Sequence, residues 1–118
     1  MAKRRNTASL EDLERREHLV RELPDLREVL RGSLVTRYRR CGRSGCHCAR
    51  EGDPGHGPAY YLVVTVGRGK TVQVYVPREH KENVERWIAN FRLARQRLEE
   101  ISALNRALLR EGALFEEE

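Results

Sequence analysis

The chain has 118 residues, of which 39% are hydrophobic and 35% charged, with three cysteines and a net charge of +5 at pH 7. This length favours one compact domain with a helical extension, and the small supply of apolar side chains requires a stabilising cross-link. The opening MAKRR leads into TASLEDLERREHL rather than an apolar run, and no stretch approaches the roughly 20 apolar residues of a membrane span. We therefore expect a cytoplasmic protein with reduced thiols and no membrane association.

The first part of the chain is predicted to be helical. Residues 1–8 form a basic arm that we expect to be disordered, and apolar residues at helical spacing then predict a helical segment over 9–31. Ser9 is the expected N-cap and Gly32 the expected C-cap. Pro24 should break or kink this helix, because proline cannot donate the backbone hydrogen bond of a helix interior.

The middle of the chain changes to the pattern of a small sheet. Three stretches rich in β-branched and aromatic residues predict strands at residues 34–39, 59–66 and 71–77. GRGK, at 67–70, predicts a short turn between the last two strands. We expect a three-stranded antiparallel sheet within a module spanning 32–77. The face that carries Val72, Val74 and Val76 should lie in the core and the other face in solvent.

The helical pattern returns after Pro77 and predicts a long helix over 78–111, followed by an acidic tail at 112–118. Such a helix is roughly 50 Å long, more than a three-stranded sheet can cover. The N-terminal helix could cover its far half as an antiparallel partner. A second copy of the chain or a partner protein could do so instead, in a coiled-coil-like seam where Asn105 helps to fix the register. The predicted fold class is therefore α+β.

The segment CGRSGCHCAREGDPGHGP connects the first two predicted strands and contains every cysteine of the chain. Three thiols and one imidazole make up the Cys3His donor set of a closed structural zinc site. The expected ligands are Cys41, Cys46, Cys48 and His56. His47 is the poorer fourth ligand, because it lies directly between two cysteines and its side chain points elsewhere. A zinc ion would fasten the two strand ends and order a loop that is otherwise costly to order.

Other interpretations of the cysteine segment remain open. A disulfide between two of the cysteines would leave the third thiol unpaired. A catalytic or redox cysteine would lack the companion Ser, Asp and His residues of an active site. An iron–sulfur cluster would lack a fourth cysteine, and coincidence is the last alternative. A zinc ion with four protein ligands has no open position for water, so the zinc interpretation predicts a structural site and no enzyme.

The positive charge of the chain is concentrated in its middle. Residues 31–81 carry ten Lys and Arg against three Asp and Glu, an excess of +7, whereas residues 1–30 sum to 0 and residues 82–118 to −2. The three sums add up to the net charge of +5. This asymmetry predicts a polyanionic partner, and nucleic acid is the obvious candidate.

The candidate nucleic-acid contacts lie on the first strand, the cysteine loop, the hairpin turn and the third strand. They are Arg37, Arg39, Arg40, Arg43, Arg50, Arg68, Lys70, Gln73 and Tyr75. If the face that carries Arg37 is also the face of Gln73 and Tyr75, the sheet presents Arg, Gln and Tyr together. A small sheet can enter the major groove, where Arg can contact guanine and Gln adenine. A merely solvated basic face is the alternative.

Two stretches of the chain resemble a known pattern. GSLVTRYRRCGRSGCHCA (32–49) and HGPAYYL (56–62) are similar to the pattern GSLxxRYxxCGxxxCxCA followed by HGPxYYL. This pattern is typical of an uncharacterised bacterial domain-of-unknown-function family whose members are often met near transposases and other mobile-element genes. The resemblance implies that Cys41, Cys46, Cys48 and His56 occupy metal-ligand-like positions, and it carries no activity.

These observations together predict a nucleic-acid-binding accessory or regulatory protein with a structural zinc site. Duplex DNA is the expected polymer because of the neighbourhood that the resemblance implies, and RNA is the second candidate. The alternative is a protein–protein adaptor in which the long helices form the functional surface and the basic sheet binds an acidic partner. A small nuclease or thiol enzyme is disfavoured, because the sequence offers no acidic metal cluster and no catalytic histidine pair.

Overall fold

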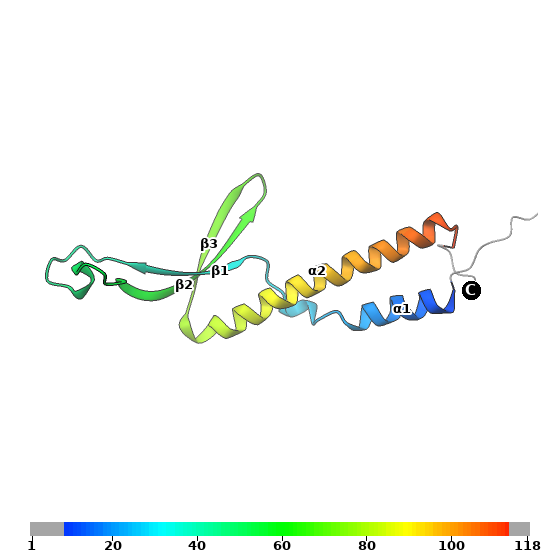
Figure 1. The fold of residues 1–118 in the computed structure, drawn as a ribbon, viewed down its shortest axis with the longest axis horizontal. Helices are drawn as coiled ribbons and strands as arrows, with labels where there is room; N and C mark the ends of the chain where they lie inside the picture. The colour runs from blue at the N-terminus through cyan, green and yellow to red at the C-terminus, as the bar shows by residue number, and fades with distance from the viewer. Residues whose placement is uncertain (1–8, 114–118) are drawn as a thin grey trace, which may run out of the picture. The chain divides into compact units, whose positions relative to one another are not determined.

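The computed structural model describes residues 9–113, which form the predicted α+β fold (Figure 1). The elements are α1 (Leu10–Arg21), β1 (Ser33–Arg39), β2 (His56–Val66), β3 (Lys70–Val76) and α2 (Lys81–Arg110), with single 3-10 turns at Leu26–Glu28, His47–Ala49 and Arg78–His80. The predicted basic arm, 1–8, and the last residues of the acidic tail, 114–118, lie outside the described residues. Within the described part, neither helix combines the length and apolar composition that crossing a bilayer requires.

The chain divides into two compact units. The sheet unit comprises residues 29–89, and the helical unit comprises residues 1–28 and 90–118. Helix α2 contributes its first turns to the sheet unit and the remainder to the helical unit.

Helix α1 begins as predicted and ends earlier than expected. The Oγ of Ser9 accepts a hydrogen bond from the backbone N–H of Asp12 at 3.1 Å, which confirms the N-cap. The helix ends at Arg21, since the residue before a proline avoids helical backbone angles and Pro24 cannot continue the hydrogen bonding. The prediction of Gly32 as C-cap is wrong. Gly32 instead precedes β1 with φ of 144°, where a Cβ atom would lie 2.8 Å from Cδ1 of Leu62.

The sheet is antiparallel with strand order β1-β2-β3. Cross-strand partners share a face, so Leu34, Leu62 and Val74 lie on one side, together with Tyr60 and Val76. We call this side the inner face. The buried core of the sheet unit joins this face to the first turns of α2 and consists of Leu62, Val76 and Ile88.

The inner face is only partly covered. Val76 is buried as predicted, but Val74 is 49% exposed, so the expectation that all three valines of β3 lie in the core is wrong. The buried cluster that α2 joins contains Val76 but not Val74. A mainly apolar groove of about 540 Å³ remains, lined by Leu30, Val74 and Trp87 among others. The Nε1 atom of Trp87 is buried without a hydrogen-bond partner.

In the helical unit, α1 lies beside the C-terminal part of α2 (Figure 1). Arg97 donates to Glu22 at 2.7 Å, and Arg16 donates to the side-chain oxygen of Asn105 at 3.1 Å. Glu22 follows Arg16 in the chain, whereas its partner Arg97 precedes Asn105, so α1 and α2 are antiparallel. Among the coverings predicted for the far half of α2, the structure shows the N-terminal helix of the same chain. The predicted register residue, Asn105, bonds to that helix.

Candidate metal centre and basic sheet face

The pairing of β1 with β2 brings the first and last predicted ligands together. Cys41 follows β1 by two residues and His56 is the first residue of β2, where it is the register partner of Arg39. Cys46 precedes the 3-10 turn of the loop, and Cys48 lies within that turn. The strand ends and one tight turn thus position all four side chains.

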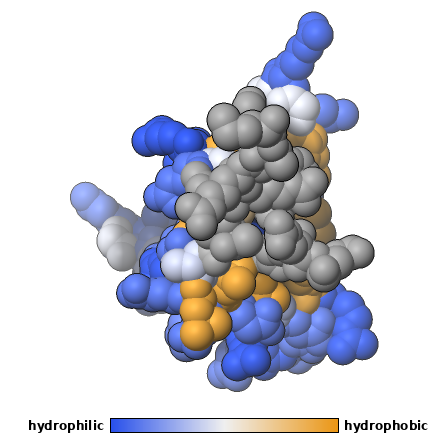
Figure 2. Space-filling view, turned by 90° about the vertical axis from the view of Figure 1, so that its right-hand side faces the viewer, coloured by the Kyte–Doolittle hydropathy of each residue, from blue (hydrophilic) through white to orange (hydrophobic). Residues whose placement is uncertain are grey.

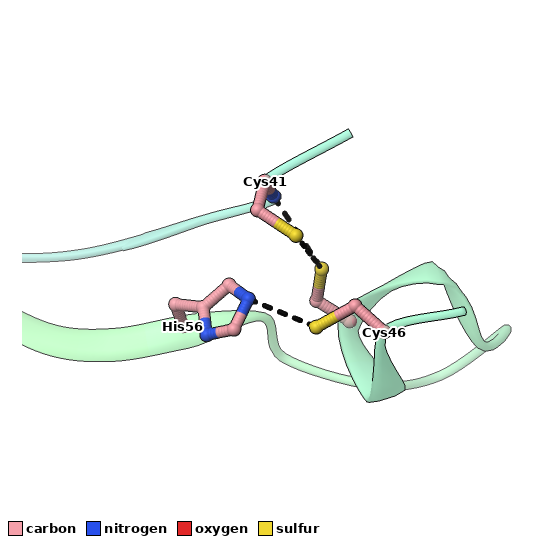
Figure 3. Close-up of side chains that lie close together, drawn as sticks. Cys41, Cys46 and His56 are labelled. Atoms are coloured by element: carbon pink, nitrogen blue, oxygen red, sulfur yellow. Dashed lines mark hydrogen bonds between the residues drawn. The ribbon is translucent and has the colours of Figure 1, made fainter. Parts of the chain in front are cut away.

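The four predicted ligand atoms form a compact group. They all lie within 4.8 Å of one another and could hold a metal ion. Sγ of Cys41 lies 3.5 Å from Sγ of Cys48, and Sγ of Cys46 lies 3.1 Å from Nε2 of His56 (Figure 3). Sulfur ligands at about 2.3 Å from a tetrahedral ion lie roughly 3.8 Å apart, so small shifts would complete such a site. All three cysteines are free thiols, and no pair forms a disulfide.

His47 lies outside this group and has a different partner. Its Nδ1 atom is 3.1 Å from Oδ2 of Asp53, and the other carboxylate oxygen of Asp53 accepts from the backbone N–H of Gly55 at 2.8 Å. Arg40 donates to the backbone carbonyl of Asp53 at 2.7 Å. The N–H of Gly55 and the His47 ring lower the pKa of Asp53. Sequence reasoning missed this residue, although an Asp in the turn sequence DPG is a recognisable signal for a turn.

The electrostatic environment differs between the thiols, and that of Cys41 favours metal binding. The backbone N–H of Arg43 lowers the pKa of Cys41 to about 6, with further contributions from His56 and Cys48. At pH 7 this side chain is therefore mostly thiolate, the form that binds a metal ion. The N–H of Cys41 also lowers the pKa of Cys48, but burial and the neighbouring thiols outweigh it and raise that pKa.

Two glycines allow β2 to approach β1 beside the candidate ligands. Gly55 and Gly57 have φ of 94° and 145°, angles that other residues rarely adopt. A Cβ atom at Gly55 would lie 2.8 Å from the carbonyl oxygen of Arg39, and one at Gly57 would lie 2.8 Å from that of Arg37. The pairing of the strands is irregular between Arg37 and Arg39. The close approach at this irregularity brings His56 near the loop cysteines.

The other side of the sheet, which we call the outer face, collects several of the predicted nucleic-acid contacts. The register places Arg37 beside Ala59, Tyr61 beside Tyr75, and Gln73 on the same side two residues along β3. The outer face therefore carries Arg37, Gln73 and Tyr75 together. The sequence predicted joint presentation of Arg, Gln and Tyr if these three residues shared a face.

Tyr61 is a further member of the outer face that sequence reasoning missed. Its ring packs edge-on against Tyr75 with 5.7 Å between the ring centroids. The guanidinium carbon of Arg37 lies 5.8 Å from the centroid of Tyr61. Only the strand register reveals this contact, because AYYLVVTV does not show which of its two tyrosines faces outwards.

The remaining predicted contacts are spread over the sheet unit. Arg39 ends β1 beside the metal site, and Arg40, Arg43 and Arg50 are exposed on the cysteine loop. Arg68 and Lys70 lie at the β2–β3 turn, at the opposite end of β2 (Figure 1). The eleven residues of β2 span roughly 35 Å, so the structure does not bring these two residues to the metal end of the sheet.

Comparison with known families identifies the wider group. The family described as Domain of unknown function (DUF6788) matches residues 10–86, and the chain belongs to it. The match spans α1, the sheet and all four candidate ligands. Neither a curated protein nor a solved structure matches the chain. Membership therefore confirms an uncharacterised domain family and assigns no activity. The expected neighbourhood of mobile-element genes stays a prediction.

Proposed function

We propose that this member of the DUF6788 family is a nucleic-acid-binding accessory or regulatory protein whose basic sheet is held by a structural zinc ion. The protein binds and does not catalyse. The two parts of the proposal, the metal and the nucleic acid, have separate support and separate tests.

The donor set of the candidate metal centre supports zinc. Zinc accepts thiolate and imidazole ligands in tetrahedral geometry, and Cys3His is a common structural combination. The three thiols and the imidazole lie within 4.8 Å of one another, and the thiol of Cys48 is 1% exposed. With four protein ligands the ion has no open position for water, which favours a structural role over hydrolysis. The measurement is elemental analysis, with about one zinc per chain as the expected result.

The observation that carries the nucleic-acid proposal is the shared face of Arg37, Gln73 and Tyr75. Exposed Arg and Lys neutralise phosphates, while Arg and Gln form paired hydrogen bonds with base edges. Arg40, Arg43 and the other loop arginines extend the positive charge beyond the sheet. Duplex DNA is the polymer that we expected from the sequence, and RNA is the second.

The salt dependence of binding tests this proposal. Fluorescence anisotropy is measured with labelled oligonucleotides between about 50 and 200 mM salt. If about five phosphates are neutralised, the logarithm of the association constant should fall against log salt with a slope near −4.5. Replacing Arg37 and Arg39 together by Ala should weaken binding and flatten the slope. The double variant Arg92→Ala with Arg95→Ala, on the exposed surface of α2, removes the same charge and should change neither. Absence of binding at low salt would refute the proposal.

A second candidate function, the adaptor, is favoured by the helical unit. Several large apolar side chains there are exposed, namely Leu10, Val20, Leu26, Leu98 and Leu109. Figure 2 views the end of this unit where α1 begins and α2 ends, and it shows hydrophobic residues grouped between hydrophilic ones. Exposed apolar patches commonly mark protein interfaces. In this candidate function the helices bind a second copy of the chain, and the basic sheet binds an acidic partner protein.

The oligomeric state tests the adaptor candidate. Sedimentation analysis over a range of protein concentrations should show a dimer that becomes monomeric on replacing Leu98 by Ser. Glu99→Ser, at the next exposed position of α2, is the matched control and should leave the dimer intact. A concentration-independent monomer would refute self-association through these helices.

A further inference from the structure

We infer that the outer face of the sheet binds an unpaired nucleobase of a single-stranded nucleic acid by stacking it against tyrosine rings. This inference rests on the proposed function and names the form of nucleic acid that the site takes. It replaces duplex DNA, the polymer that the sequence predicted, by a single strand, because the outer face carries exposed tyrosine rings.

The site is an open hollow at the metal end of the outer face. Its volume is about 600 Å³, within the roughly 300–1,000 Å³ of sites that hold small organic groups. The side chains that define it are Arg37, Tyr38, Arg39, His56, Tyr61 and Tyr75. Three aromatic rings and two guanidinium groups thus converge beside a candidate metal ligand.

The tyrosines of the hollow present their rings to solvent. Tyr75 is 59% exposed and Tyr38 is 50% exposed, although apolar ring surface normally stabilises a small domain by being buried. In the edge-on contact between Tyr61 and Tyr75, one ring contributes only its edge, so both of its faces stay free of that contact. A flat aromatic group can therefore stack here without displacing the pair.

Charge and aromatic surface together select the ligand. Single-stranded nucleic acid is bound by aromatic side chains that stack on bases and by basic groups that follow the phosphates. Bases inside a duplex are stacked on each other and offer only their edges, so they cannot use a ring face. Arg37 lies over Tyr61, and Arg39 borders the same hollow, so both can reach the phosphates next to a stacked base. An acidic protein would use the arginines but would leave the tyrosine rings without a partner.

The test compares one strand in two forms. A labelled oligonucleotide of about 12 nucleotides, with 2-aminopurine at its centre, is titrated as a single strand and after annealing to its complement. We expect the single strand to bind at least about tenfold more tightly, with 2-aminopurine fluorescence quenched by stacking. Tyr75→Ala should weaken single-strand binding about tenfold and abolish the quenching, with a clearly smaller loss of duplex binding. Tyr75→Phe keeps the ring and should behave like the native protein.

The control variant is Val74→Ala, which alters the neighbouring residue of β3 on the inner face and should change neither binding nor quenching. Circular dichroism melting establishes that both alanine variants are folded. Equal affinity for the two forms, with no effect of Tyr75→Ala, would overturn this inference and leave the proposed function standing. Polyglutamate bound as tightly as the single strand would also overturn the inference, in favour of an acidic protein partner. Failure of both nucleic-acid forms to bind would overturn the inference and the proposed function together.

Discussion

Replacement of His56 by Ala should release the proposed zinc ion and unfold the cysteine loop. His56 supplies the one nitrogen of the candidate donor set and is also the first residue of β2. Its removal therefore disconnects the metal from the second strand while leaving the three thiols in place. Three thiols without the imidazole leave the tetrahedral ion one protein ligand short, so the affinity for zinc should fall strongly.

The free energy that zinc must supply follows from the number of residues and hydrogen bonds in the loop. Sixteen residues, 40–55, separate β1 from β2. Ordering their backbone costs about 16 kcal/mol at about 1 kcal/mol per residue. Backbone hydrogen bonds within the loop join the N–H groups of Cys46, Ala49, Arg50 and Asp53 to carbonyls three residues earlier. Three further hydrogen bonds of the loop involve Asp53, with Arg40, His47 and Gly55 as partners. At about 1 kcal/mol each the seven bonds return about 7 kcal/mol. The remaining deficit of about 9 kcal/mol is close to the lower end of the roughly 10–16 kcal/mol released when zinc binds small structural sites.

The assay combines metal content with thermal unfolding. Protein purified without chelator is analysed for zinc, and the fluorescence of Trp87, the single tryptophan of the chain, is followed during heating. Even a loss of about 3 kcal/mol should lower the melting temperature by about 12–24 °C in a unit of this size. His47→Ala is the matched control, since His47 lies on the same loop and bonds to Asp53 rather than to the thiols. It should retain the metal.

Two results would refute this reasoning. Retention of zinc by His56→Ala would show that the ligand set is wrong. The second result is an equal melting temperature of the metal-free native protein before and after addition of zinc. It would show that something else orders the loop and that zinc has no structural role.

Two further substitutions test the local geometry. Gly55→Ala should destabilise the sheet unit by about 1–3 kcal/mol, because of its positive φ and the carbonyl of Arg39 at 2.8 Å. Gly45→Ala, where a Cβ atom meets nothing within 4 Å, should melt like the native protein, and equal melting of both variants would contradict the argument. Arg97→Ala should destabilise the helical unit by about 1.5–3 kcal/mol, since a charged hydrogen bond to Glu22 is lost from a side chain that is only 19% exposed. If Arg97→Ala and the native protein lose their helical content at the same urea concentration, that expectation is wrong.

The regular elements could be predicted because their signals are local. Alternating valines in TVQVYVP, turn glycines in GRGK and the stripe of apolar residues after Pro77 each depend on a few neighbouring residues. The strands and the long helix accordingly lie where they were expected, to within a few residues. Strand β2 begins three residues early, at His56, because its pairing with Arg39 extends the ladder into the metal loop.

The metal centre could be predicted from spacing, whereas the residues that support it could not. Thiol and imidazole side chains are rare, so five of them within the sixteen residues 41–56 indicate a shared metal site. The hydrogen bonds of Asp53 to the loop, and the approach of Gly55 to Arg39, involve common residue types with no distinctive spacing. Such contacts become visible only when the path of the loop is known.

The outer face shows why function was harder to predict than fold. Moving the pairing of two strands by one residue turns every side chain to the opposite face. In that case Tyr60 rather than Tyr61 would lie beside Tyr75 on the outer face, and Tyr61 would turn to the inner face. The sequence motif AYYLVVTV is compatible with both arrangements, so the position of the tyrosines depends on register. The hollow is tied to the candidate metal centre by a different contact, because His56 lines the hollow and is also a candidate ligand and the partner of Arg39. Metal binding and the proposed base-stacking surface should therefore be lost together when the ion is removed.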